Sequence, residues 1–391
     1  MSTKSVKEIV SFCQEIFEDL EFTKAREWKD AKAGRKVIGF MPVYVPREII
    51  HAAGMLPLGI LGGGADMEVI HGDAYYQSYI CRIPRSTIEL AITGKLDFVD
   101  GMMFPSICDV IRNLSGIWKL LFKEKYVRYF DAPQNFKDDV GGVFYANELR
   151  ELKEGLEQLG GRKFTDTDLN NSIAVFNENR RWVNKVYDFR SATPWKAPSA
   201  EVYLLMRAGM VLPVEEHTRL MQEYLAAAEA ENLPMRDNCR VVLTGAFCEQ
   251  PPLNLIKSLE MAGCYIVDDD FMMVNRWLQG DVTTSGDPIE NLAKAFLHQS
   301  AETAAKYEED MDVKGAYLLD IISKRRADGV IFAAPSFCDP ALLDQPMLVT
   351  RLEARKIPYI TMQYAENSGQ MQPIREQAGT FADSIKLWGA A

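Results

Sequence analysis

The sequence is poor in the features that mark membrane, nucleic-acid-binding and exported proteins. It has no run of 18 uncharged apolar residues, so no segment is predicted to span a membrane. Its 44 Lys and Arg residues are outnumbered by 55 Asp and Glu residues, and the net charge of -11 argues against a nucleic-acid partner. Glu8, Glu15 and Glu18 interrupt the apolar positions near the start. This segment therefore predicts an amphipathic helix instead of a signal peptide, and we expect a cytoplasmic protein.

Cysteine is scarce as well, with 7 residues and no CxxC pair, which argues against a zinc ribbon or a thioredoxin-type redox motif. Any metal site must therefore combine cysteines that are distant in the sequence. The GxxxxGK[ST] pattern of P-loop proteins is also missing, so we do not expect ATP to bind through such a loop. The GILGGG stretch at 59–64 is the nearest match to a phosphate-binding loop, but a tight turn after a strand is the simpler interpretation.

Two parts of the sequence repeat the same order of strands and helices. Helical patterns, several of which begin at proline and end at glycine, separate short runs rich in apolar and β-branched residues. These runs predict strands at 36–45, 56–61, 98–105 and 125–133, and again at 240–247, 264–270, 328–335 and 356–367. Such alternation is typical of parallel sheets with helical crossovers. The expected fold class is α/β, with two flavodoxin-like, doubly wound domains joined by a helical segment.

The sequence also predicts where these domains begin and end. We expect an N-terminal α/β lobe with a leading helix at 1–147, a helical connecting region at 148–236 and a C-terminal α/β lobe at 237–391. The connecting region has capping residues followed by apolar positions at helical spacing. It either packs across the two lobes or forms a surface for a partner, and packing is the more common role.

A short motif occurs once in each predicted lobe. PSICD at 105–109 follows the strand DGMMF, and PSFCD at 335–339 follows DGVIFAA. Ligands of open parallel sheets bind beyond the carboxyl ends of the strands, where the chain turns into a helix. Cys108 and Cys338 lie at this point, and a helix N-terminus is expected to lower the pKa of a thiol there. Facing lobes would bring both thiolates into one cleft, although duplication alone can also preserve buried cysteines.

Cys81, in SYICRIPR, is a third candidate metal ligand and lies ahead of a predicted helix. A cubane iron–sulfur cluster normally binds four cysteine thiolates, and three protein ligands would leave one iron open. Arg82, Arg85 and Arg112 would offset the charge of such a cluster, or else are solvated surface residues. Cys248 also follows a strand and is the reserve ligand. With Cys248 as a fourth ligand, a structural zinc site on the same cysteines is an alternative.

The proton donors are not identifiable, and no catalytic or substrate-binding residue is predicted. Of the histidines, His51 lies within a predicted helix, where a structural role is expected, and His217 and His298 are expected at the surface. Asp268, Asp269 and Asp270 end a predicted strand. They would lie near the cleft or, more simply, form a turn that caps the next helix.

The sequence resembles the 2-hydroxyacyl-CoA dehydratase and benzoyl-CoA reductase family. The likeness covers essentially the whole chain, including GFMPVYVPREIIHAAGMLPLGILGG near the start, the three cysteine segments and AGCYIVDDD before the last third. It implies two flavodoxin-like lobes and a [4Fe-4S] cluster on three cysteines, which fall here on Cys81, Cys108 and Cys338. It also implies several partners: a homologous second catalytic subunit, ATP-hydrolysing iron–sulfur activator subunits, and ferredoxin as the upstream electron donor.

Within this family the sequence is most similar to the reductases. This likeness implies an iron–sulfur subunit of an oxygen-sensitive, ATP-dependent enzyme that dearomatises benzoyl-CoA to a cyclic dienoyl-CoA by single-electron transfer. The alternative within the family is a radical 2-hydroxyacyl-CoA dehydratase that uses the same cluster. From a different class, two α/β lobes around a cleft also describe solute-binding proteins, but those are usually exported.

Overall fold

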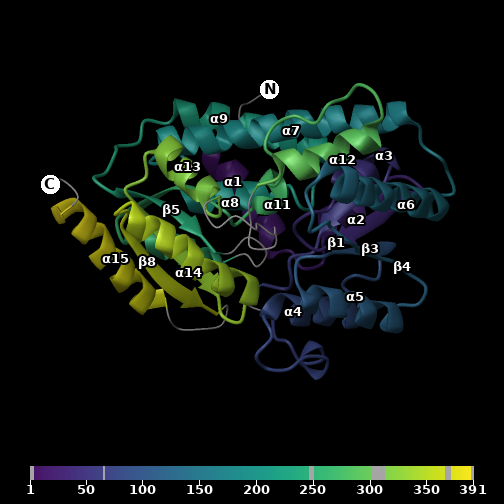
Figure 1. Ribbon diagram of the computed structural model, residues 1–391, viewed down its shortest axis with the longest axis horizontal. Coiled ribbons are helices and arrows are strands. Elements are labelled where there is room, and N and C mark those ends of the chain that lie inside the picture. Colours follow the sequence, from purple (N-terminus) through teal and green to yellow (C-terminus); the bar gives the residue numbers. More distant parts are fainter. Residues whose placement is uncertain (1–3, 65–66, 246–250, 302–312, 366–370, 389–391) are drawn as a thin grey trace.

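In the computed structural model, the strands form two four-stranded parallel sheets (Figure 1). The structure describes residues 4–64, 67–245, 251–301, 313–365 and 371–388. The first sheet has the order β2-β1-β3-β4 and the second the order β6-β5-β7-β8. Both match the first four strands of the flavodoxin-like order. The strands are β1 (Val37–Phe40), β2 (Leu56–Gly59), β3 (Gly101–Pro105), β4 (Tyr126–Phe130), β5 (Cys239–Thr244), β6 (Cys264–Asp269), β7 (Gly329–Pro335) and β8 (Tyr359–Tyr364).

The central strands of both sheets are buried along most of their length. Every residue of β1, β3 and β7 is buried, because helices cover both faces of each sheet. Close packing beside β1 also requires a residue without a side chain. A Cβ atom at Gly39 would lie 2.7 Å from the Sδ atom of Met102 on the neighbouring strand β3. The buried central strands correspond to the continuous apolar runs from which they were predicted.

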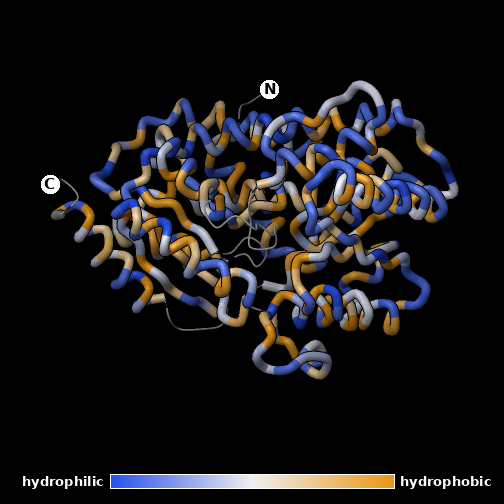
Figure 2. The backbone as a smooth tube through the Cα atoms, viewed as in Figure 1, coloured by the Kyte–Doolittle hydropathy of each residue, from blue (hydrophilic) through white to orange (hydrophobic). Residues whose placement is uncertain are grey.

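Helices surround both sheets, and their outer faces are largely hydrophilic (Figure 2). The N-terminal part contains α1 (Val6–Glu18), α2 (Thr23–Asp30), α3 (Arg47–Ala52), the 3-10 helix η1 (Gly72–Ala74), α4 (Arg82–Ile92), α5 (Asp109–Leu121) and the π-helix η2 (Asp138–Gly142). The middle part contains α6 (Val143–Gly160), α7 (Asp166–Ala192), α8 (Ser199–Ala208) and α9 (Val214–Ala230). The last part contains α10 (Leu253–Met261), α11 (Met273–Arg276), α12 (Pro288–Gln299), α13 (Ala316–Arg325), α14 (Asp339–Ala354) and α15 (Met371–Trp388).

The long helix α7 connects the two halves of the molecule. Its 27 residues run along one side of the molecule and contact α3 in the first half and β6 in the second (Figure 1). A capping box at Thr165 and Asp168 fixes its start, because each side chain accepts a hydrogen bond from the other residue's backbone N–H group. The main hydrophobic core correspondingly includes residues from both halves. The connecting region therefore packs across both sheets.

The expected fold class is confirmed by the two parallel sheets and their helical crossovers. Each predicted strand is present, and the leading amphipathic helix is α1. The boundaries at 147 and 236 stay a prediction. Within the described ranges, no helix has the length and apolar character needed to cross a membrane.

Candidate metal centre

Three cysteines from three helix starts line one pocket. Cys81, Cys108 and Cys338 are the N-cap residues of α4, α5 and α14, respectively. The pocket between them has an empty volume of about 580 Å³, part of which is open to solvent. Cys338 is buried and the other two thiols are partly exposed. The expectation that facing lobes bring the cysteines of the repeated motif into one cleft is therefore met by the geometry.

The two PS-x-CD segments have the same local structure. Pro105 and Pro335 end β3 and β7, which occupy the same place in the order of their sheets. The next residue in each segment is a serine whose backbone N–H donates to the last residue of the neighbouring strand. Ser106 bonds the carbonyl of Phe130 at 3.0 Å, and Ser336 bonds that of Tyr364 at 2.7 Å. This shared turn directs both cysteines to the carboxyl edges of the sheets.

The two segments differ at the residue between serine and cysteine. Ile107 is buried, with an exposed fraction of 8%, whereas Phe337 is 52% exposed and has a left-handed backbone with φ of 68°. Both side chains line the pocket. The walls are otherwise mostly apolar, formed by Met41, Pro42, Ile80, Ile83, Val110, Ile111 and Pro340. Asp109 and Asp339 complete the lining.

The expectation of a lowered thiol pKa is wrong for Cys108. Burial raises the pKa of Cys108 to about 11. The N–H groups of Ile111 and Val110 in the first turn of α5 oppose this shift, as expected of a helix N-terminus. The nearby thiol of Cys338 and the carboxylate of Asp109 add to the rise. The helix start therefore favours the thiolate, but desolvation is the larger effect, and a metal would have to displace the proton.

The three thiols suit a cluster better than a single ion. Within the described residues, no group of three or more His, Cys, Asp or Glu side chains could hold a metal ion. A single zinc ion needs its donors at about 2.0–2.3 Å from one centre. In a cubane each thiolate binds a different iron, so ligands spread around an apolar pocket fit that group. Cys248, the reserve ligand, lies outside the described residues.

The arginines near Cys81 are engaged by the segment that precedes α4. Arg85 forms an ion pair with Asp73 at 2.9 Å, and Arg82 donates a hydrogen bond to the carbonyl of Met67. Arg112 lies in the first turn of α5. Their role in offsetting the charge of a cluster stays a prediction.

Comparison with known proteins identifies the family. The model of the 2-hydroxyglutaryl-CoA dehydratase D-component family matches residues 42–385, which include all three cysteines. The chain belongs to this family. The family assignment removes the solute-binding alternative.

Individual members of the family differ greatly in their similarity to this chain. A benzoyl-CoA reductase subunit of Thauera aromatica, the one designated C, is 67% identical over 384 residues, which cover 98% of this chain and 100% of the relative. The (R)-phenyllactyl-CoA dehydratase beta subunit of Clostridium sporogenes is 27% identical and covers 90% of this chain and 93% of its own. The (R)-2-hydroxyglutaryl-CoA dehydratase subunit beta of Acidaminococcus fermentans is 28% identical with the same coverage. The expected likeness to the reductases is thus confirmed.

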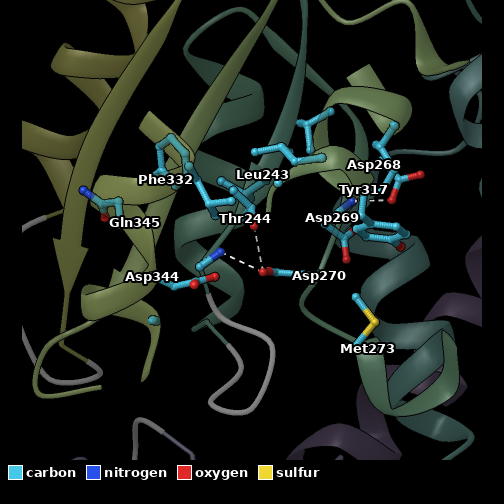
Figure 3. A pocket seen from close by; sticks show the side chains of 17 residues that line it. Leu243, Thr244, Asp268, Asp269, Asp270, Met273, Tyr317, Phe332, Asp344 and Gln345 are labelled. Atoms are coloured by element: carbon cyan, nitrogen blue, oxygen red, sulfur yellow. Dashed lines mark hydrogen bonds between the residues drawn. The ribbon is translucent and has the colours of Figure 1, made fainter. Parts of the chain in front are cut away.

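A second pocket, with an empty volume of about 700 Å³, is lined by the three aspartates at and just after the end of β6, Asp268, Asp269 and Asp270 (Figure 3). Asp270 accepts hydrogen bonds from the Thr244 hydroxyl at 2.9 Å and from the Gly245 N–H at 2.7 Å. Asp268 and Asp269 bind the arginines behind them. The second pocket shares no lining residue with the cysteine pocket, so the aspartates and the thiols line different pockets.

Asp268 and Asp269 belong to a buried ion-pair network that the sequence analysis missed. Asp268 pairs with Arg276 at 2.7 Å and with Arg325 at 2.7 Å, and Asp269 pairs with Arg190 at 2.6 Å. Burial opposes ionisation of Asp268, but the arginines outweigh it and lower the pKa of this carboxyl to about 2. The expected capping role is therefore wrong for Asp268. No local signal marks the network, because its arginines come from α7, α11 and α13.

Three of the four histidines carried an expectation, and one of these expectations is wrong. His51 lies 2.8 Å from the Ser172 hydroxyl and 3.1 Å from a Glu215 carboxylate oxygen, as expected for a structural residue. His298 is exposed and pairs with Asp138, also as expected. His217 was expected at the surface but is 1% exposed. It lies on the buried face of α9. The charged residues next to it in the sequence had suggested an exposed position.

Proposed function

We propose that this chain is the iron–sulfur subunit of a benzoyl-CoA reductase that converts benzoyl-CoA to a cyclic dienoyl-CoA. The observation that carries the proposal is 67% identity over the full length of a relative named as a subunit of benzoyl-CoA reductase. Relatives named as dehydratase subunits share 27–28% identity. Reduction of the ring adds two electrons and two protons. This chain would transfer the electrons.

Cys81, Cys108 and Cys338 would hold a [4Fe-4S] cluster in the pocket that they line. Support comes from the donor set itself, since soft thiolates select iron–sulfur clusters and the pocket walls are apolar. When bound, the cluster would supply single electrons of low potential. The N–H groups at the start of α5 would stabilise a thiolate ligand. The apolar walls would keep water away, and thereby protect low-potential electrons from protons.

The partners of this chain are proposed from the same likeness. A relative that is itself named as one subunit implies an enzyme of several chains. We infer a homologous second catalytic subunit, ATP-hydrolysing iron–sulfur activator subunits and ferredoxin as the upstream donor. The missing GxxxxGK[ST] pattern in this sequence is consistent with ATP hydrolysis on another chain.

The metal content of the Cys338→Ala variant tests the cluster. The chain would be produced without oxygen, together with its partner subunits, and its iron, zinc and reduced-state EPR spectrum measured. We expect about four irons per chain and loss of the cluster signal in Cys338→Ala. Cys13→Ala is the matched control, because Cys13 is buried in α1 and does not line the pocket. Stoichiometric zinc in the wild type, or an unchanged signal in Cys338→Ala, would overturn the assignment.

Activity assays separate the reductase from the dehydratase. The reconstituted complex should oxidise a low-potential donor with benzoyl-CoA and show no turnover with 2-hydroxyacyl-CoA thioesters. The opposite preference would establish the alternative within the family.

A further inference from the structure

Two cysteines far from the metal centre form a close pair. Cys239 begins β5 and Cys264 begins β6, and the two residues are direct partners in the register of these parallel strands. Their sulfur atoms are 3.7 Å apart. Both residues are buried, with exposed fractions of 3% and 0%, and neither lines the cysteine pocket.

The backbone geometry of the pair is compatible with a disulfide. Neighbouring strands lie about 4.8 Å apart, within the Cα separation of roughly 4.4–6.8 Å that disulfides span. The side chains of directly paired residues project from the same face of a sheet, and here the sulfurs already face each other. Closure to the S–S bond length of about 2.05 Å therefore requires side-chain rotation and little movement of the backbone.

The environment makes the two sulfurs chemically different. The hydrogen bond between the two thiols lowers the pKa of Cys239 and raises that of Cys264. Burial opposes the thiolate at both positions, and the positive charge of Lys386 on α15 favours it. Burial also raises the pKa of Cys13 in α1, to about 12.

An exposed segment of the chain lies just before Cys239, which is itself buried. The chain from 232 to 237 is exposed and irregular, and it enters β5 at this residue. Opening the first residues of the strand is a local motion that does not require unfolding of the sheet.

We propose that Cys239 and Cys264 are a redox-active dithiol that hydrogen peroxide converts to an intramolecular disulfide. The Cys239 thiolate attacks one peroxide oxygen and breaks the O–O bond, which gives a sulfenic acid and hydroxide. The Cys264 sulfur then attacks the Cys239 sulfur, and the sulfenic oxygen leaves as water. The dithiol loses two electrons and two protons, and one peroxide becomes two waters.

The disulfide would link the edge strand β6 covalently to β5. β6 is the outer strand of its sheet and pairs with β5 alone among the strands of the described residues. A covalent link at the start of both strands would hold β6 in its register during oxidative exposure. Thiol reductants would reverse it.

Peptide mapping tests the pair directly. The assembled complex would be treated with limiting hydrogen peroxide, alkylated with N-ethylmaleimide and digested without reduction. We expect a linked peptide that joins Cys239 to Cys264, and dithiothreitol should remove it. In Cys264→Ser, Cys239 should instead react with dimedone as a sulfenic acid. Recovery of both residues as alkylated thiols after peroxide is consumed would overturn the proposal, as would a link from Cys239 to another cysteine.

Thermal unfolding provides a second readout. The linked chain should melt a few degrees higher than the reduced chain, because the crosslink restricts the unfolded state. Cys13 serves as the internal control, since it should stay unlinked under the same treatment. An unchanged melting temperature would contradict stabilisation of the fold by the crosslink between β5 and β6.

Discussion

His217 is held as a neutral ring by two hydrogen bonds inside the helical layer. Its Nε2 lies 3.1 Å from the carbonyl oxygen of Leu205, and its Nδ1 lies 3.1 Å from the side-chain nitrogen of Asn179. The carbonyl can only accept and the amide nitrogen can only donate, so the proton is on Nε2. Burial, and next the charge of Arg47, lower the pKa of this histidine to about 3.

This histidine predicts a specific acid sensitivity. The unfolded chain binds a proton near pH 6.5, but the folded ring resists protonation until about pH 3. The free energy of unfolding should therefore be constant above pH 6.5 as far as His217 is concerned, and fall as the pH decreases from 6.5 towards 3. Denaturant unfolding between pH 7 and 4 should show a shallower decline in His217→Gln than in the wild type. Equal slopes would mean that His217 does not contribute to acid unfolding.

At the scale of elements, the aspartates at the end of β6 tie this strand to three helices. Arg190 comes from α7, Arg276 from α11 and Arg325 from α13. Arg276 also lies over the ring of Tyr187 on α7, at 3.6 Å from the ring centroid. Asp268 and Asp269 of this network also line the second pocket.

Removing one arginine of this network should be costly. In Arg276→Met, Asp268 loses one of its two close partners while staying buried, so we expect a loss of about 3–5 kcal/mol in the free energy of unfolding. Arg181→Met is a matched control: Arg181 pairs with Asp281 at the surface, where both side chains are about half exposed. That exposed pair should contribute less than about 1 kcal/mol. Similar losses in the two variants, measured by urea unfolding, would show that the buried charge of Asp268 does not depend on Arg276.

The elements were more predictable from the sequence than their ion pairs. Strands such as β3 and β7 are short, fully apolar and bounded by Asp-Gly and Pro-Ser, so local patterns sufficed to find them. The helices that follow these two strands begin at N-cap cysteines. Asp268 looked like a turn residue because its arginine partners lie on helices outside β6, and a sequence pattern does not show that these helices fold back onto the strand.

The candidate site was predictable in part for the same reason. The repeated motif located Cys108 and Cys338, since equivalent strands end at equivalent edges. The net direction of the Cys108 pKa was not predictable, because it depends on how deeply the thiol is buried. The effect of the helix N-terminus alone had suggested a lowered pKa for Cys108.

At the scale of the whole molecule, the metal centre spans both halves. Cys81 and Cys108 begin helices of the first half, and Cys338 begins a helix that contacts β7 of the second sheet. A cluster bound to all three thiols would link the two sheets independently of α7.

Removal of the proposed cluster should therefore loosen the molecule as a whole. Chelation of iron without oxygen is expected to lower the melting temperature and to speed limited proteolysis of the chain, because the apo form loses ligand stabilisation of the native state. The Cys338→Ala variant should show the same proteolysis with or without chelator. An identical melting curve before and after complete iron loss would contradict a role of the metal in holding the halves together.

The packing of α12 on α6 has a consequence for protein synthesis. Phe296 stacks on Tyr145 with ring centroids 4.4 Å apart and also contacts Tyr44, just after β1. The ribosome releases Tyr44 long before Phe296, by an interval on the order of ten seconds or more at usual elongation rates. During this interval Tyr44 and Tyr145 lack their contact with Phe296, so we expect a chaperone that binds exposed aromatic side chains to associate with the nascent chain until α12 emerges.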